Sequence, residues 1–187
     1  SRNSSRDITA TEQYLQRVRA DGYLVHGAGS ICFKSRYLLT TETTIEVQGP
    51  QTMGEVEFAA FKCGDGIYVS VASDHNDRSM VELWTSSLGK IYDSAKSKQI
   101  VPAVMAKDAW LYEDVKGHWE ELVLKSFVTV SDQKIPYQEF TLGEIFDLDY
   151  YSREASWFQE SGSILLGGSC GRVSTVPNHV YQGQTEL

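Results

Sequence analysis

The chain has 187 residues, of which 25 are acidic and 17 basic, giving a formal net charge of −8 at pH 7. This length supports one hydrophobic core, so we expect a single domain over residues 1–187. The excess of negative charge argues against nucleic acid and anionic membranes as partners, because both bind basic surfaces. No apolar run approaches the roughly 20 residues that cross a bilayer, and no leader peptide is recognisable, which predicts a cytoplasmic protein. The sequence starts at Ser1 without a methionine, which is compatible with missing residues at either end.

The three cysteines, Cys32, Cys63 and Cys170, are widely spaced and form no Cys-x-x-Cys pair. This pattern predicts neither a disulfide framework nor a thiolate zinc site. We expect each of them to be a small buried residue. No histidine partner is recognisable that would make Cys170 a nucleophile.

Residues 1–30 are expected to form a short helical region ahead of a strand-rich core. Thr9 and Glu12 have the spacing of a capping box before an apolar stripe, which predicts a helix over residues 9–20. Two short strands are predicted after it, over residues 37–39 and 44–47.

An acidic hairpin is predicted next. Residues 54–58, Gly-Glu-Val-Glu-Phe, alternate charged and apolar side chains, so Glu55 and Glu57 share one face of a strand. Residues 67–72 form the returning strand, because a Gly-Asp pair between the two segments is typical of a tight hairpin turn. With that pair at the centre of the turn, Asp74 lies directly opposite Glu55.

Three carboxylates on one patch repel one another, so the cluster needs a compensating cation or a raised pKa. Oxygen ligands favour Mg²⁺, Ca²⁺ or Mn²⁺ over zinc. The sequence therefore predicts a divalent-cation site at Glu55, Glu57 and Asp74. The alternative is a solvated strand face, which is the ordinary meaning of alternating charge.

The rest of the chain mixes short elements of both kinds. The predicted elements are a helix over 78–90, a basic loop over 94–99 leading to a buried stretch over 100–104, short helical turns over 108–119, a strand over 121–130, a turn over 131–134, a short helix over 141–148 and a strand over 164–168. Strands outnumber helices without a regular strand–helix alternation. This order predicts an α+β, β-rich fold and argues against a doubly wound sheet.

Four features in the same order resemble the fumarylacetoacetate hydrolase superfamily. They are Glu55-Val56-Glu57, Asp74 with Arg78 four residues later, Ala95-Lys96-Ser97 followed by Pro102, and the Gly-Gly-Ser loop after the last apolar strand. Within the superfamily, the phrases Gly-Glu-Val-Glu-Phe, Ser-Asp-His-x-Asp-Arg and Ser-Lys-Gln are most similar to an uncharacterised domain-of-unknown-function group. The likeness extends from about residue 52 to about residue 171.

The resemblance implies a β-roll core with peripheral helices and a homodimer. It also implies one Mg²⁺ or Mn²⁺ ion held by Glu55, Glu57 and Asp74. Substrates of the superfamily are usually 2-oxo or 1,3-dioxo acids, so a small anionic oxo acid is the expected partner.

Other site residues follow from the same resemblance. Lys96 is expected to reach the bound substrate, and Arg78 is expected to lie near it. Gly168 and Ser169 correspond to the superfamily's substrate-contacting Gly-Thr-Pro loop, with Cys170 in place of the proline.

The sequence departs from the superfamily where water is activated. The N-terminal His-Glu pair of the mobile lid has no counterpart, and His26 is the only upstream histidine. Val81 and Glu82 stand where a glutamine often follows the arginine, and Asp77 stands where a small residue is common. His75 is a candidate for proton transfer, because histidine titrates near neutral pH, although continued strand alternation would turn it away from the carboxylates.

These observations predict a metal-dependent enzyme that acts on a small oxo acid through a metal-stabilised enolate, by C–C hydrolysis or decarboxylation. Two alternatives remain open from the sequence. One is an isomerase or cyclase that steers the enolate without water attack. The other is a non-catalytic binding protein that keeps the fold.

Overall fold

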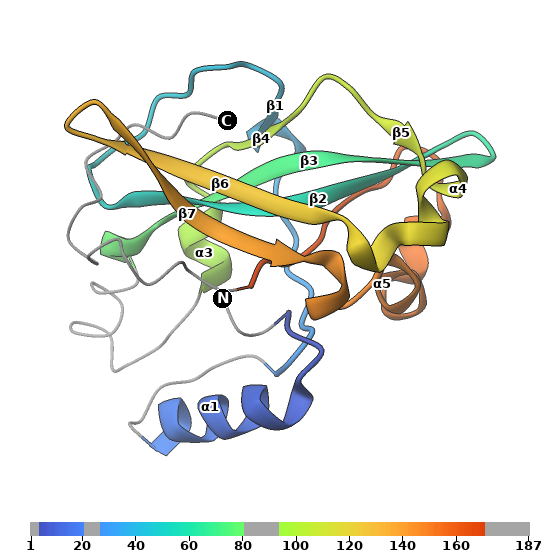
Figure 1. Ribbon diagram of the computed structural model, residues 1–187, viewed down its shortest axis with the longest axis horizontal. Helices are drawn as coiled ribbons and strands as arrows, with labels where there is room; N and C mark the ends of the chain where they lie inside the picture. The colour runs from blue at the N-terminus through green and yellow to red at the C-terminus, as the bar shows by residue number, and fades with distance from the viewer. Residues whose placement is uncertain (1–3, 21–26, 81–93, 171–187) are drawn as a thin grey trace.

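A long antiparallel hairpin forms the centre of the molecule (Figure 1). The computed structural model describes residues 4–20, 27–80 and 94–170. Strand β2 (Thr52–Cys63) pairs with β3 (Gly66–Asp77) along its whole length, and Glu55 lies opposite Asp74, as predicted. Gly64 has a φ of 57°, the left-handed conformation that a tight hairpin turn requires.

Six further strands complete two sheets. They are β1 (Leu39–Thr40), β4 (Ala103–Met105), β5 (Trp110–Leu111) and β8 (Ile164–Leu166) in the central sheet, with β6 (Val123–Val130) and β7 (Gln133–Thr141) in a second hairpin. The central sheet has the order β1-β4-β3-β2-β8, and β5 pairs with the other end of β3. Only β1 and β4 pair in parallel; the remaining pairs of the described strands are antiparallel.

Short helices connect and flank the sheets. The α-helices are α1 (Ile8–Ala20), α3 (Ser94–Lys98), α4 (Tyr112–Val115) and α5 (Leu148–Glu154). The 3-10 helices are η1 (Arg36–Leu38), η2 (Lys116–Glu121), η3 (Leu142–Glu144) and η4 (Ser156–Gln159). The fold is therefore α+β and strand-rich, as the sequence predicts.

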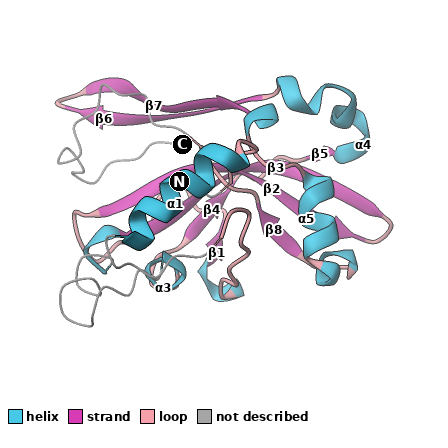
Figure 2. Cartoon of the chain, turned by 90° about the horizontal axis from the view of Figure 1, so that it is seen from below, coloured by secondary structure: helices cyan, strands magenta, loops and turns pink. Residues whose placement is uncertain are grey.

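The two faces of the central sheet have different neighbours. Val56, Phe58 and Ala60 of β2 are buried in the hydrophobic core with residues of the β6–β7 hairpin, α5 and η4. The ring of Phe58 meets Trp119 edge to face, with 5.1 Å between ring centroids. Helix α3 lies on the opposite side of the sheet from β6 and β7 (Figure 2). The acidic side chains of β2 therefore face α3.

The N-terminal helix is confirmed, but its cap differs from the prediction. The helix starts at Ile8, and the Asp7 carboxylate accepts a hydrogen bond from the backbone N–H of Ala10 at 2.9 Å. Asp7 thus caps the helix in place of Thr9, because a carboxylate placed before the first turn satisfies the free N–H groups there.

Two local predictions are wrong for reasons of context. Residues 44–47 form no strand. Val47 is 41% exposed, and residues with a preference for strands form one only where they can pack on a partly buried sheet. The predicted basic loop over 94–99 is mostly the helix α3. Of the predicted helix over 78–90, residues 78–80 are helical and residues 81–90 lie outside the described residues.

The second half of the chain is only partly predicted. Strands β6 and β8 fall within their predicted ranges, and the predicted turn over 131–134 contains Ser131 and Asp132 with positive φ. The returning strand β7 was not predicted. The helix expected over 141–148 is divided into η3 and α5.

The cysteines are less buried than predicted. Cys32 and Cys63 are exposed, and Cys170 is half-buried. Within residues 4–20, 27–80 and 94–170, none of the three is joined in a disulfide. Burial, with the nearby Glu144 carboxylate, raises the pKa of Cys170 and thus disfavours the thiolate form that a nucleophile needs.

No helix in the described part of the chain is both long and apolar enough to cross a membrane.

Candidate active site

Three carboxylates form a buried cluster at the centre of the sheet. The hairpin register places Glu55 opposite Asp74, and strand alternation places Glu57 on the same face. Their residues are only 7%, 5% and 4% exposed for Glu55, Asp74 and Glu57 respectively. We call these three residues the carboxylate cluster. Their burial rules out the alternative of a solvated strand face.

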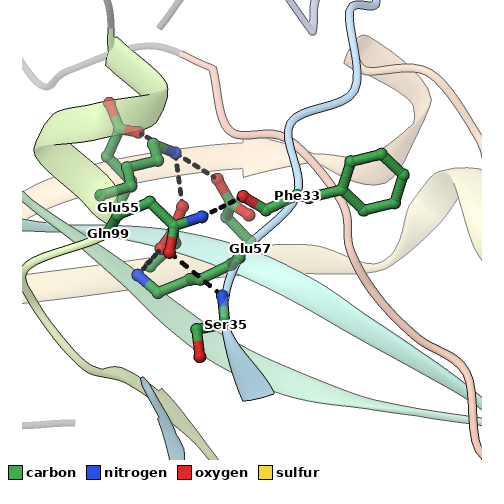
Figure 3. Close-up of polar contacts among 8 residues, drawn as sticks. Phe33, Ser35, Glu55, Glu57 and Gln99 are labelled. Atoms are coloured by element: carbon green, nitrogen blue, oxygen red, sulfur yellow. Dashed lines mark hydrogen bonds and ion pairs between the residues drawn. The ribbon is translucent and has the colours of Figure 1, made fainter. Parts of the chain in front are cut away.

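The Lys98 ammonium lies among all three members of the carboxylate cluster (Figure 3). Its Nζ is 2.5 Å from Asp74 Oδ2, 3.4 Å from Glu55 Oε2 and 3.8 Å from Glu57 Oε1. One positive charge thus compensates several buried negative ones. The sequence analysis placed Lys98 only within the predicted basic loop over 94–99 and did not single it out as a site residue.

The helical geometry of α3 explains which lysine faces the cluster. Residues two apart in an α-helix are separated by about 200° around its axis, so Lys96 and Lys98 lie on nearly opposite sides. With Lys98 directed to the sheet, Lys96 is exposed. The structure does not bring Lys96 to the carboxylate cluster, because the segment is a helix and not the loop that the sequence suggested.

A second lysine reaches the cluster from a distant segment. Lys34 Nζ is 2.9 Å from Asp74 Oδ1, on the other oxygen from the one that Lys98 contacts. The Gln99 side chain holds the backbone on both sides of Lys34: it donates to Phe33 O and accepts from Ser35 N at 3.1 Å (Figure 3). These two hydrogen bonds tie the backbone on both sides of Lys34 to the residue that follows α3.

Burial and the attraction between Lys98 and the carboxylates are the main electrostatic effects in the cluster. Burial, followed by the charges of Asp74 and Glu55, raises the pKa of Glu57 well above its usual value, against the lowering effect of Lys98. Burial alone would lower the pKa of Lys98, but the three carboxylates outweigh it and raise that pKa. The ammonium is thus charged near neutral pH, and the raised pKa means that Glu57 retains a proton more readily than an ordinary glutamate does.

This raised pKa predicts how the stability of the cation-free protein depends on pH. Because native Glu57 binds its proton more tightly than the unfolded chain does, its contribution to the free energy of unfolding is complete below the ordinary glutamate pKa of about 4.3. That contribution is lost progressively as the pH rises from there through the raised pKa. We expect urea unfolding over a pH series to show this loss as a difference between wild type and Glu57→Gln. A difference independent of pH would contradict it.

His75 lies on the other face of the sheet. Strand β3 continues to Asp77, so alternation turns His75 away from Asp74, and its Nε2 is 3.0 Å from where a Cβ on Gly54 would stand. Burial lowers the pKa of His75, against the opposing effect of Asp74. The structure therefore does not bring His75 to the carboxylate cluster as a proton carrier.

Arg78 and Asp77 mark the end of β3. The Asp77 carboxylate accepts hydrogen bonds from Ser79 N at 2.8 Å and Ser79 Oγ at 2.5 Å, as an N-cap of the helical residues that follow. Arg78 is partly buried, and its backbone N–H donates to Gln51 O. Among the described residues, no ion pair joins its guanidinium to the carboxylate cluster.

The Gly-Gly-Ser loop packs closely beside the sheet. A Cβ on Gly167 would overlap the Phe58 ring, and one on Gly168 would overlap the Ser4 side chain. Burial raises the pKa of Tyr151 to about 12, against hydrogen bonds with Ser4 and the Gly168 backbone, and the charge of Glu57 adds to the rise. The loop is thus linked through Tyr151 to the hydrophobic core, where the centroid of the Tyr151 ring lies 6.3 Å from that of the Phe58 ring. Ser169 is fully buried, and its Oγ has no hydrogen-bond partner within the described ranges.

Two residues that the sequence did not single out also belong to this region. The Gln138 side chain on β7 accepts a hydrogen bond from Val56 N at 2.8 Å and thereby holds the strand between the two glutamates. Asn76 shares the face of Asp74, two residues along β3. It is 4% exposed, and its Oδ1 has no hydrogen-bond partner in the described part of the chain.

The carboxylate cluster has the oxygen donors of a divalent-cation site, but in its present geometry it holds an ammonium group. As they stand, no three acidic, histidine or cysteine side chains of residues 4–20, 27–80 and 94–170 are arranged to hold a metal ion directly. However, three carboxylates surround one cationic group, the Lys98 ammonium, and oxygen ligands of this kind suit Mg²⁺ or Mn²⁺. The chemistry fits provided that Lys98 gives up its position to the ion.

Comparison with solved structures identifies the class of fold. The chain is similar to a putative fumarylacetoacetate hydrolase family protein from Yersinia pestis CO92, with 13% identity, a TM-score of 0.51 and coverage of 73% of this chain and 67% of that one. It is also similar to Cg1458, with 14% identity, a TM-score of 0.50 and coverage of 72% of this chain. The chain spans 57% of the length of Cg1458. The fold is that of fumarylacetoacetate hydrolase family proteins.

Comparison of the sequence identifies the family to which the chain belongs. The chain belongs to DUF2848, a family of proteins of unknown function, whose model matches residues 28–177. No curated protein matches the chain.

Proposed function

We propose that this chain is a divalent-metal-dependent enzyme that acts on a small 2-oxo or 1,3-dioxo acid through an enolate. The observation that carries the proposal is the convergence of Glu55, Glu57 and Asp74 on the Lys98 ammonium in a buried site. A buried array of this kind is unfavourable unless its charges are matched, and it is therefore a strong candidate for a functional site.

The carboxylates would hold one Mg²⁺ or Mn²⁺ ion. When bound, such an ion acts as a Lewis acid on the keto oxygen and stabilises the negative charge of an enolate. Lys98, no longer paired with three carboxylates, offers its ammonium to the acid group of the substrate. Burial of the cluster excludes water, which strengthens each of these interactions.

The position of His75 favours reactions without water attack. It lies on the opposite face of the sheet from the cluster, and none of the described residues supplies the missing His-Glu lid pair. Decarboxylation, or a proton shift that isomerises the substrate, needs no activated water. We therefore propose decarboxylation first and enolate isomerisation second, ahead of C–C hydrolysis.

The test is turnover of an oxo-acid panel that includes oxaloacetate and an acylpyruvate. We expect product formation with Mg²⁺ or Mn²⁺ and none after removal of the metal with EDTA. Uptake of solvent deuterium next to the carbonyl, without bond cleavage, identifies isomerisation. If no panel member binds or reacts in the presence of metal, the enzyme proposal fails and a non-catalytic binding protein is left.

A further inference from the structure

The arrangement around Lys34 has no counterpart in the sequence motifs. Lys34 comes from an irregular segment before the sheet, 40 residues from Asp74 in the chain, yet its side chain is only 12% exposed. Gln99 fixes the backbone at Phe33 and Ser35, so the segment presents one side chain to the cluster. Phe33 is also near Trp157, with 5.8 Å between their ring centroids.

The charges show what this second lysine changes. With all three carboxylates ionised, as a bound cation would keep them, these groups and the two ammonium groups among the described residues carry one net negative charge before the cation is counted. A divalent cation makes the net charge one positive, whereas without Lys34 the same loaded site would be neutral. The positive charge that remains for a second anionic group of the substrate is therefore due to Lys34.

The fate of Lys34 on loading points to the same role. A cation that takes the place of Lys98 at Asp74 Oδ2 leaves Lys34 on Asp74 Oδ1, and an ammonium has three N–H donors, so Lys34 can bind an anionic ligand as well as Asp74. The face already holds a further unused polar group, because Asn76 Oδ1 is buried without a partner among the described residues. Both observations indicate a site prepared for a ligand with more than one polar end.

We propose that Lys34 is a specificity-determining residue that binds the distal carboxylate of a dicarboxylic 2-oxo acid. The inference rests on the proposed function and adds the substrate class to it. Lys98 and the metal ion would then take the 2-oxo acid end, and Lys34 the other end.

The test compares two probes that differ only in the distal carboxylate, 2-oxoglutarate and 2-oxopentanoate. Binding of each is measured by calorimetry at saturating Mn²⁺. We expect wild type to bind 2-oxoglutarate about 10-fold or more tightly, as a hydrogen bond between charged groups provides. Lys34→Gln should reduce this preference to less than about 2-fold, and Lys34→Arg should keep part of it.

The control is Lys125→Gln, which removes a positive charge from an exposed pair with Glu139 on the β6–β7 hairpin. It should retain the wild-type preference. Equal binding of the two probes to wild type, or an unchanged preference in Lys34→Gln, overturns the assignment of Lys34 while the proposed function stands. If neither probe binds to the Mn²⁺-loaded wild type, the assignment of Lys34 fails, and turnover of the oxo-acid panel decides the proposed function separately. Circular dichroism of Lys34→Gln and Lys34→Arg confirms that folded proteins are compared.

Discussion

Glu57→Ala is expected to abolish divalent-cation binding while the chain remains folded. Glu57 supplies one of only three carboxylates at the cluster, and even residues that merely support metal ligands change affinity by about 10- to 100-fold. Loss of a direct ligand should therefore weaken Mg²⁺ or Mn²⁺ binding by more than about 100-fold. Calorimetry measures the affinity, and circular dichroism checks the fold.

A matched control variant distinguishes the loss of a metal ligand from the loss of a negative charge elsewhere on the protein. Glu139 pairs with Lys125 on an exposed part of the β6–β7 hairpin, so Glu139→Ala removes a carboxylate of the same overall charge. This variant should bind Mg²⁺ like wild type. Unchanged Mg²⁺ affinity in Glu57→Ala would remove the metal from the proposed function. A crystal soaked with Mn²⁺ and oxalate would show directly whether anomalous density lies among Glu55, Glu57 and Asp74.

Lys98→Met is expected to produce the largest loss of stability in the cation-free protein. The substitution keeps the apolar stem but removes the ammonium that all three buried carboxylates share. Removal of one partner from a buried ion pair costs about 3–5 kcal/mol. Urea unfolding without divalent cations should show a decrease of this order in the free energy of unfolding.

Added Mg²⁺ should reverse much of this loss. A cation that binds only the folded state at 100 times its Kd contributes about 2.7 kcal/mol, and Lys98→Met has no ammonium to compete with the ion. The control is Lys96→Met, in the same helix but exposed, which should change stability by less than about 0.5 kcal/mol. Equal small effects of the two variants would show that the Lys98 contacts are energetically unimportant.

The carboxylate cluster was predictable because its determinants are local. Alternation sets the face of Glu55 and Glu57, and a two-residue turn sets the register that brings Asp74 opposite Glu55. The burial of the cluster could not be predicted from local sequence, because it depends on which elements cover that face of the sheet. The missed strand β7 shows the same limit: its residues become a strand through pairing with β6.

Lys98 and Lys34 differ in whether the sequence could have predicted their positions at the carboxylate cluster. Helical periodicity over 94–98 could have separated Lys96 from Lys98, had the segment been recognised as a helix, but no local signal marks Lys34. Lys34 reaches the carboxylate cluster because contacts between distant parts of the chain hold its backbone segment near α3.

For this protein, the sequence by itself determined the acidic hairpin and the chemical character of its site, since strand alternation and turn geometry act over a few residues. The tertiary structure alone decided which cations compensate the carboxylates. Lys98 and Lys34 reach Asp74 from segments 24 and 40 residues away, and such pairing is favoured only once folding has removed the charges from water.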